Sequence, residues 1–219
     1  MKTYLGLSIV DLFLLSRPPS YYESQRSDKN KALTSIEKNK NIIKNISYYL
    51  KKIGETSKVY SVRSIVSRYL RYHRDGTLNN RKINVSGKDI SYRSFFIKIR
   101  EQAITNLPED PAIYYGWAYI DKYDKGYRVK FKKTFTYKNE KIKISFFIRD
   151  NLIEKYEIKR LITKRIKKIS SLSKPTAFVF IYGKPKIKTI KEKNKKFINF
   201  EMNNLDYMDI DANHPLLRK

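Results

Sequence analysis

The chain has 219 residues and carries 48 Lys and Arg against 21 Asp and Glu, so its formal net charge is +27 at pH 7. Hydrophobic residues make up 41% of it and aromatic residues 14%, a content that excludes a disordered basic tail and predicts a folded core. Because it has no cysteine and only two histidines, His73 and His214, we expect no disulfide, no metal site and no cofactor.

The positive charge predicts an anionic neighbour. A surplus of this size repels itself in a compact fold unless something acidic lies against it. Nucleic acid suits Lys and Arg well, because each neutralised phosphate releases condensed counterions. Two alternatives stay open: a cationic surface that only solubilises the protein, and an acidic protein partner.

Residues 1–28 are expected to form an arm and a linker. The segment from Tyr4 to Leu15 is mostly apolar, but Asp11 interrupts it and no small-residue cleavage pattern follows. It is also shorter than the roughly 20 residues that a membrane-spanning helix needs. We therefore expect a short helix or arm that docks on this protein or on a neighbour, with no signal peptide and no membrane partner.

Residues 29–107 are expected to form a helical region with a short β-hairpin. Apolar residues recur at helical spacing over 29–53 and again over 57–72. Strand-like residues on both sides of a glycine-containing turn predict a hairpin over 83–92. A third amphipathic pattern predicts a helix over 92–107.

The second of these helices is a candidate DNA-reading helix. It carries Arg63, Arg68 and Arg71, and the following hairpin carries Lys82 and Lys88. Two helices followed by a basic hairpin are typical of a winged-helix module, whose second helix enters the major groove. The alternative is that the helices pack on each other or on identical subunits.

Pro108 and Pro111 mark the boundary to the second half of the chain, 112–204, for which we expect an antiparallel sheet plus a helix. Over 127–137 and 142–148, apolar residues alternate with Lys and Arg. Two adjacent strands with this pattern share one apolar face and one cationic face, as a half-buried hairpin does.

The remainder is expected to contain a helix over 151–170, a buried strand over 177–182, a cationic loop over 183–196, a last strand over 197–202 and a tail over 205–219. The predicted fold class is therefore α+β. It has a helical N-terminal half with a small hairpin, then an antiparallel β-β-β-α-β-β C-terminal half.

The candidate nucleic-acid-binding residues are the cations of the predicted hairpin and of the cationic loop. They are Arg128, Lys130, Lys132, Lys141, Lys143, Lys186, Lys188, Lys191, Lys193, Lys195 and Lys196. Most are lysines, which lack the bidentate fork that reads guanine, so we expect binding that is independent of base sequence. A solvated face is the alternative. Base stacking is the least favoured hypothesis, because the alternation places most hairpin aromatics on the apolar face, and Trp117 is expected in the core.

No catalytic residue is predicted. Asp121, Asp124 and Glu140 flank the hairpin and are the carboxylates best placed for a metal-dependent nuclease, a hypothesis that we disfavour. The chain has seven glycines and no glycine-rich phosphate loop. We expect a protein without enzymatic activity.

The layout of residues 123–205, hairpin then helix then hairpin, resembles that of the small ring-forming connector proteins of phage tails. The resemblance implies a structural role in a virion. We therefore expect a non-catalytic component of a large nucleic-acid-containing assembly, a virion or a ribosome-like particle in the cytoplasm. Its basic faces would lie against DNA, RNA or acidic subunits, and the arms 1–28 and 205–219 would contact other subunits, identical or different. The alternative is a free sequence-nonspecific DNA- or RNA-binding protein or a winged-helix-like regulator.

Overall fold

The computed structural model describes residues 10–13, 58–59, 61–155, 160–190 and 195–211. The chain divides into two compact units, one made of Met1–Tyr60 and Asn80–Ser91, the other of Ser61–Asn79 and Tyr92–Lys219. The helix expected over 29–53 lies outside the described residues.

The first unit contains a four-stranded sheet in the order β2-β1-β3-β4. Its strands are β1 (Val10–Phe13), β2 (Lys58–Val59), β3 (Lys82–Val85) and β4 (Lys88–Ser91). Strand β1 pairs in parallel with both β2 and β3 and buries Phe13. This part of the apolar N-terminal segment is therefore a strand and not a helix. The antiparallel hairpin of β3 and β4 confirms the hairpin predicted over 83–92.

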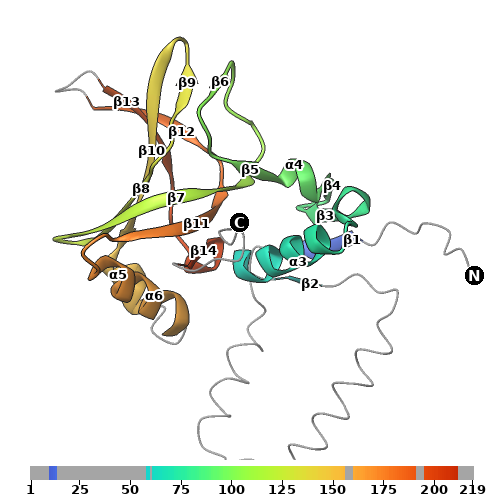
Figure 1. Cartoon of the computed structure of the whole chain (residues 1–219), viewed down its shortest axis with the longest axis horizontal. Coiled ribbons are helices and arrows are strands. Elements are labelled where there is room, and N and C mark those ends of the chain that lie inside the picture. The colour runs from blue at the N-terminus through green and yellow to red at the C-terminus, as the bar shows by residue number, and fades with distance from the viewer. Residues whose placement is uncertain (1–9, 14–57, 60, 156–159, 191–194, 212–219) are drawn as a thin grey trace, which may run out of the picture. The chain divides into compact units, whose positions relative to one another are not determined.

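The second unit is built on a ten-stranded sheet that curls into half a barrel. Its main path runs β12-β13-β10-β8-β7-β11-β14 (Figure 1). The strands are β5 (Phe96–Lys98), β6 (Gln102–Ile104), β7 (Ala112–Tyr123), β8 (Gly126–Phe131), β9 (Phe135–Tyr137), β10 (Glu140–Arg149), β11 (Thr176–Gly183), β12 (Lys186–Ile190), β13 (Lys195–Phe200) and β14 (Met208–Asp211). The described helices are α3 (Val62–Arg74), α4 (Tyr92–Phe95), α5 (Asp150–Lys155) and α6 (Arg160–Ser170), with 3-10 turns η1 (Leu78–Asn80) and η3 (Leu205–Tyr207).

Strands β7 and β8 form an antiparallel hairpin that opens into a fork. Their last paired residues are Ala118 and Phe131. Beyond this pair β5 runs parallel to β7, the chain turns back, and β6 runs parallel to β9. The turn between β5 and β6 reaches the opening of the fork, where the Ile99 backbone nitrogen donates to the Tyr115 carbonyl at 2.8 Å. The fork explains why this region is strand: two open sheet edges supply its backbone partners.

The prediction of a helical N-terminal half is wrong, because the structure is mostly β-sheet. The predicted helix over 92–107 is a four-residue helix, α4, followed by β5 and β6. The C-terminal half also departs from an antiparallel β-β-β-α-β-β order, since β13 pairs in parallel with β10. Part of the cationic loop expected over 183–196 is strand β12, and residues 208–211 of the expected tail form β14, which pairs with β11.

Several elements of the C-terminal half are confirmed. The hairpin of β8 and β9 with β10 turns between the two alternating segments, and Lys138 and Asn139 take the left-handed φ values of 49° and 64° that a tight turn needs. Strand β11 is buried on both faces, as its continuous apolar run predicts. Helices α5 and α6 agree with the helix predicted over 151–170, except that α5 begins one residue earlier, at Asp150, and that residues 156–159 lie outside the description.

The two faces of the large sheet have different environments. We call the face that carries Ala118, Ile120 and Val129 the core face, because it packs against Ile166 and Ile169 of α6 in the main hydrophobic core. The opposite side is the outer face. Its β11 end packs against α3 through an aromatic cluster, whose rings include Tyr69, Phe96, Tyr115, Phe178 and Phe180. Tyr69 stacks on Phe96 with ring centroids 3.9 Å apart. The rest of the outer face forms the site described below.

Helix α3 is fixed by its ends and by one apolar side. The Ser61 hydroxyl accepts from the Ser64 backbone nitrogen at 3.4 Å and caps the first turn. Gly76, with φ of +68°, follows the last turn. The buried side chains are spaced three or four apart, the period of one helix face; they are Val62, Ile65, Val66, Tyr69 and Tyr72.

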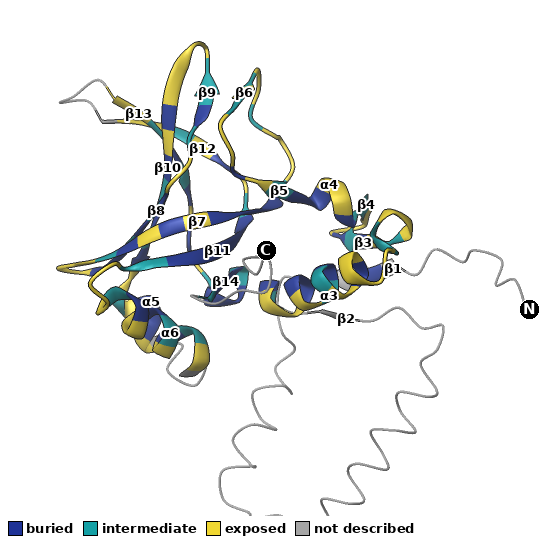
Figure 2. Ribbon diagram, in the orientation of Figure 1, coloured by how far each residue is buried: buried dark blue, intermediate teal, exposed yellow. Residues whose placement is uncertain are grey.

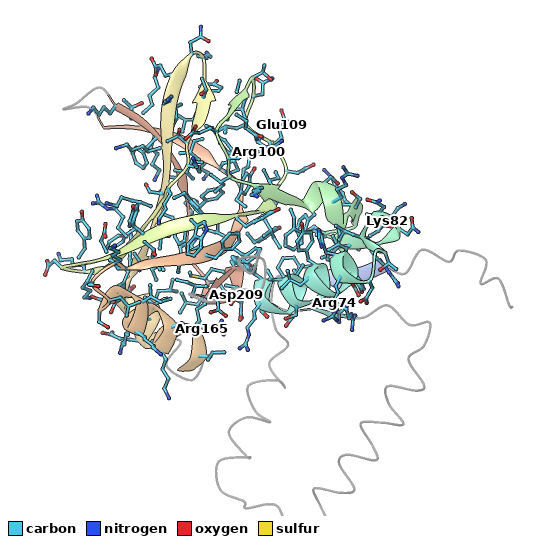
Figure 3. The ribbon with its side chains drawn as sticks, viewed as in Figure 1. Arg74, Lys82, Arg100, Glu109, Arg165 and Asp209 are labelled. Carbon is cyan, nitrogen blue, oxygen red and sulfur yellow. The ribbon has the colours of Figure 1, made fainter. Side chains whose placement is uncertain are left out.

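Arg165 of α6 clamps the edge strand β14. Its Nη1 donates to the Ile210 carbonyl at 2.9 Å and lies 3.4 Å from Asp209 Oδ1, while Nη2 lies 3.2 Å from Asp211 Oδ2 (Figure 3). Burial raises the pKa of the Asp209 carboxyl above its ordinary value, although Arg165 acts in the opposite direction. Desolvation of the carboxylate therefore outweighs its attraction to the guanidinium.

This balance predicts the sign of a pH effect. An acid whose pKa is higher in the folded than in the unfolded protein costs stability as pH rises from the unfolded value, about 3.9, through the folded one. We expect Asp209→Asn to gain in unfolding free energy relative to the wild type as pH rises through that window, measured by urea denaturation at several pH values. Asp211→Asn controls for loss of a carboxylate beside Arg165. A relative loss for Asp209→Asn with rising pH would show that the ion pair dominates.

Gly126 and Gly116 give a second test of the sheet. Gly126 has φ of +150°, and a Cβ there would collide with the Ile148 carbonyl oxygen on β10. We expect Gly126→Ala to lower the unfolding free energy by about 3 kcal/mol, because strain and overpacking add. At Gly116 a Cβ would lie 3.5 Å from Ile99 Cβ, an ordinary contact. Gly116→Ala should therefore stay within about 1 kcal/mol of the wild type in the same denaturation experiment.

Candidate nucleic-acid interface

Strand β7 places a row of exposed aromatic rings on the outer face. Side chains alternate along a strand, so Ala118 and Ile120 point into the core and their neighbours point out. Trp117, Tyr119 and Tyr123 are 39%, 43% and 42% exposed. Figure 2 shows the resulting yellow and dark blue bands along β7. Several large exposed rings on one strand form an apolar patch of the kind that marks an interaction site.

The neighbouring strand β8 sets cations beside these rings. Lys130 pairs with Tyr119 across the two strands, and Arg128 pairs with Asp121. Lys132 follows, held by a 2.8 Å hydrogen bond from its backbone nitrogen to the Trp117 carbonyl. Opposite side chains in such a ladder stand on the same face, so rings and cations alternate across the strands.

Two of the cations lie over the rings. Lys132 Nζ is 4.8 Å from the ring centroid of Tyr119 and 5.4 Å from that of Trp117. The Arg128 guanidinium carbon lies 4.3 Å from the Tyr123 ring centroid. Each such contact contributes about 0.5–1 kcal/mol at an exposed site and holds the ring and the charge in one arrangement.

The cationic surface continues across β10, β13 and β12. The register carries one row from Lys130 through Ser145 and Asn199 to Lys186. A second row runs from Lys143 through Phe197 to Lys188. We call this outer surface the basic aromatic face. It comprises Trp117, Tyr119, Tyr123, Arg128, Lys130, Lys132, Lys143, Arg149, Lys186, Lys188 and Lys195.

Acidic groups offset only a small part of this charge. Asp121 and Glu201 are the described carboxylates paired with cations of the face. Lys130 Nζ lies 2.7 Å from Asp121, and Lys186 Nζ lies 3.0 Å from Glu201. The hydrogen bond from Lys186 lowers the pKa of the Glu201 carboxyl below its ordinary value. Exposed pairs of this kind contribute little to stability, so an anionic ligand can compete for either lysine.

The structure thus gathers most of the predicted cations on one surface. Lys141 stands near the β9 end of β10, opposite Thr136. Lys196 follows Lys195 on β13 and therefore points to the opposite face of the sheet. Its Nζ lies 3.2 Å from Glu140 Oε2. Lys191 and Lys193 lie outside the described residues.

The candidate DNA-reading helix is α3. Arg63 and Arg71 are exposed on it and Arg68 is half-buried, while the opposite side of the helix packs on β11 and β14. The hairpin proposed as its wing belongs to the first unit and α3 to the second.

The aromatic row was missed from the sequence. Trp117 was expected in the core and is exposed. The hairpin rings Tyr127 and Phe131 do face the core, as predicted. The preceding strand, β7, instead exposes three of its rings on the outer face. The available signal was the alternation in Trp117-Ala118-Tyr119-Ile120, in which small and branched residues separate the rings.

Within the described ranges, no three His, Cys, Asp or Glu side chains gather where they could hold a metal ion. Asp121 and Glu140, considered above as nuclease carboxylates, are each paired with a different lysine. No described helix has the length and apolar character needed to cross a membrane. No known protein family, curated protein or solved structure matches this chain.

The positive potential of the face is testable through Trp117, the one tryptophan of the chain. A local cation attracts iodide and repels caesium within a Debye length of about 10 Å at 0.1 M salt. We expect the ratio of iodide to caesium quenching to be higher for Trp117 than for free N-acetyltryptophanamide in the same salts, and Lys132→Gln to lower this ratio. The control Lys167→Gln, an equal charge change on α6, should leave it nearly intact. Neutral acrylamide reports accessibility alone, and a ratio equal to that of the free indole would contradict the assignment.

Proposed function

We propose that this protein is a non-catalytic, sequence-independent nucleic-acid-binding component of a nucleoprotein assembly, with the basic aromatic face against the nucleic acid. The observation that carries the proposal is the imbalance on that face: eight Lys and Arg stand against Asp121 and Glu201. Polyphosphate backbones relieve such an imbalance and gain counterion entropy.

The chemistry of the cations supports backbone contact over base reading. Lysines make up most of the set, and a lysine ammonium is a point charge that any phosphate satisfies. The guanidinium of Arg128 lies over the Tyr123 ring, so it is already engaged in a cation–π contact. The cations are also spread over several strands, as suits a backbone that tracks across a surface.

Cations on the opposite side support an assembly over a free binder. Helix α6 packs on the core face and exposes Lys164, Lys167 and Lys168. One nucleic-acid strand on the outer face leaves these three charges unmatched. A packed particle, in which nucleic acid or acidic subunits surround the protein, supplies anions on both sides.

The salt dependence of binding tests the backbone contact. We expect Lys143→Gln, Lys188→Gln and Lys195→Gln together to reduce the slope of log affinity against log salt by about 3 on duplex DNA, because each phosphate contact contributes about 0.9. The matched control is Lys164→Gln, Lys167→Gln and Lys168→Gln on α6, which should change the slope far less. If the two triple variants reduced the slope equally, the basic aromatic face would not be the binding site. Fluorescence anisotropy of a labelled oligonucleotide provides the measurement.

The native mass tests the assembly. We expect the purified protein to migrate as a particle larger than one chain, and nuclease treatment to lower its mass. A monomer that shifts oligonucleotides steeply with salt would favour the alternative, a free binding protein. A nucleic-acid-free monomer that ignores oligonucleotides at low salt would exclude both.

A further inference from the structure

We infer that the basic aromatic face takes single-stranded nucleic acid in preference to duplex, with bases stacking on Trp117, Tyr119 and Tyr123. This inference rests on the proposed function and specifies its ligand. Backbone charge alone does not separate the two forms of nucleic acid, because both present phosphates. The rings do, because bases inside a duplex stack on one another and leave no free face for a side chain.

The exposure of the rings is the first observation. Among the described residues the exposed large hydrophobic side chains are Trp117, Tyr119, Tyr123, Leu161 and Leu172. The three aromatic ones stand on one strand and one face. Solvent-exposed rings on a sheet offer the sequence-tolerant platform on which unpaired bases stack, because every base has a π-face.

Their spacing is the second observation. Alternate residues of a strand lie about 6.7 Å apart, which is roughly twice the 3.4 Å rise per nucleotide of a B-DNA strand. Trp117 and Tyr119 are one such step apart, and Tyr123 is two further steps along. Rings at this separation match bases drawn apart from one another, as an extended single strand presents them.

Arg128 supplies the third observation. Its Nε is buried and donates to no acceptor in the described part of the chain, and its guanidinium lies over Tyr123. Lys132 stands over the other two rings. Each platform therefore has a cation over its ring, and a base that stacks there takes the position of the cation and leaves it next to the phosphate of that base.

Charge complementarity selects nucleic acid over other occupants. An apolar protein surface would cover the rings and bury the adjacent cations without counter-charges, at a large desolvation cost. An acidic peptide would satisfy the cations and leave the rings without stacking partners. Single-stranded nucleic acid satisfies both groups.

Trp117 reports the event directly, because it is the only tryptophan in the chain. The full-length protein is titrated at low salt with oligo(dT), with a mixed-sequence duplex and with linear polyphosphate, at matched phosphate concentration. We expect oligo(dT) to quench Trp117 fluorescence to saturation and to bind more tightly than the duplex. Polyphosphate, which has charge but no bases, should bind and leave the fluorescence nearly unchanged.

Ring variants separate stacking from charge. We expect Tyr119→Leu and Tyr123→Leu each to weaken oligo(dT) binding about 5-fold or more, the lower end of the stacking contribution per base, and to leave polyphosphate binding unchanged. Tyr119→Phe and Tyr123→Phe keep the ring and should keep the affinity. Urea denaturation, as used for the sheet variants, checks that the leucine variants are folded.

The outcomes distinguish the two levels of the proposal. Equal affinity for duplex and oligo(dT), no quenching and no effect of the leucine variants would overturn the inference and leave the proposed function standing. If none of the three polyanions binds at low salt, the proposed function fails and the inference fails with it.

Discussion

The second unit depends on strand β7, because this strand pairs with three others, β11, β5 and β8, and meets two different environments along its length. One edge pairs with β11 from Ala112 to Tyr119. The other edge pairs with β5 up to Tyr115 and with β8 from Ala118 onward, so the change of partner falls at Gly116 and Trp117, beside Ile99. On the outer face, Tyr115 lies in the aromatic cluster with α3, whereas Trp117, one alternation further, is exposed. One strand thus passes from a core to an exposed aromatic surface.

The sequence was sufficient to predict the structure where residues close together in the chain determine it. The β8–β10 hairpin alternates apolar and cationic residues and has a turn that needs positive φ, so its pairing and both its faces followed from local pattern. It was insufficient for residues 92–107. Phe95, Phe96 and Ile99 recur at helical spacing, yet the segment forms strands because the fork between β7 and β9 offers open edges. Parallel pairings of this kind join distant segments, and no local period encodes them.

The candidate site divides in the same way. Its cations were predicted from composition and alternation, and the register of β8, β10, β13 and β12 brings most of them to one face. Its rings were not predicted, because a tryptophan in an apolar strand is usually part of the core. The sequence also does not show which part of the sheet α3 covers. Exposure at Trp117 is a property of tertiary packing. The charge is the basis for the predicted class of partner, and the rings are the basis for the proposed preference for single strands.

The Arg165 clamp also bears on how copies of this protein can associate. Strand β14 is one outer strand of the large sheet, and its Ile210 carbonyl accepts from Arg165, which removes an acceptor that an incoming strand would use. The other outer strand, β12, carries Lys186 and Lys188, charges of the kind that repel a like strand. The two end strands of the main sheet path thus each carry a feature that disfavours pairing with another strand. In the assembly proposed above, copies of the protein can therefore crowd together without these two strands joining their sheets.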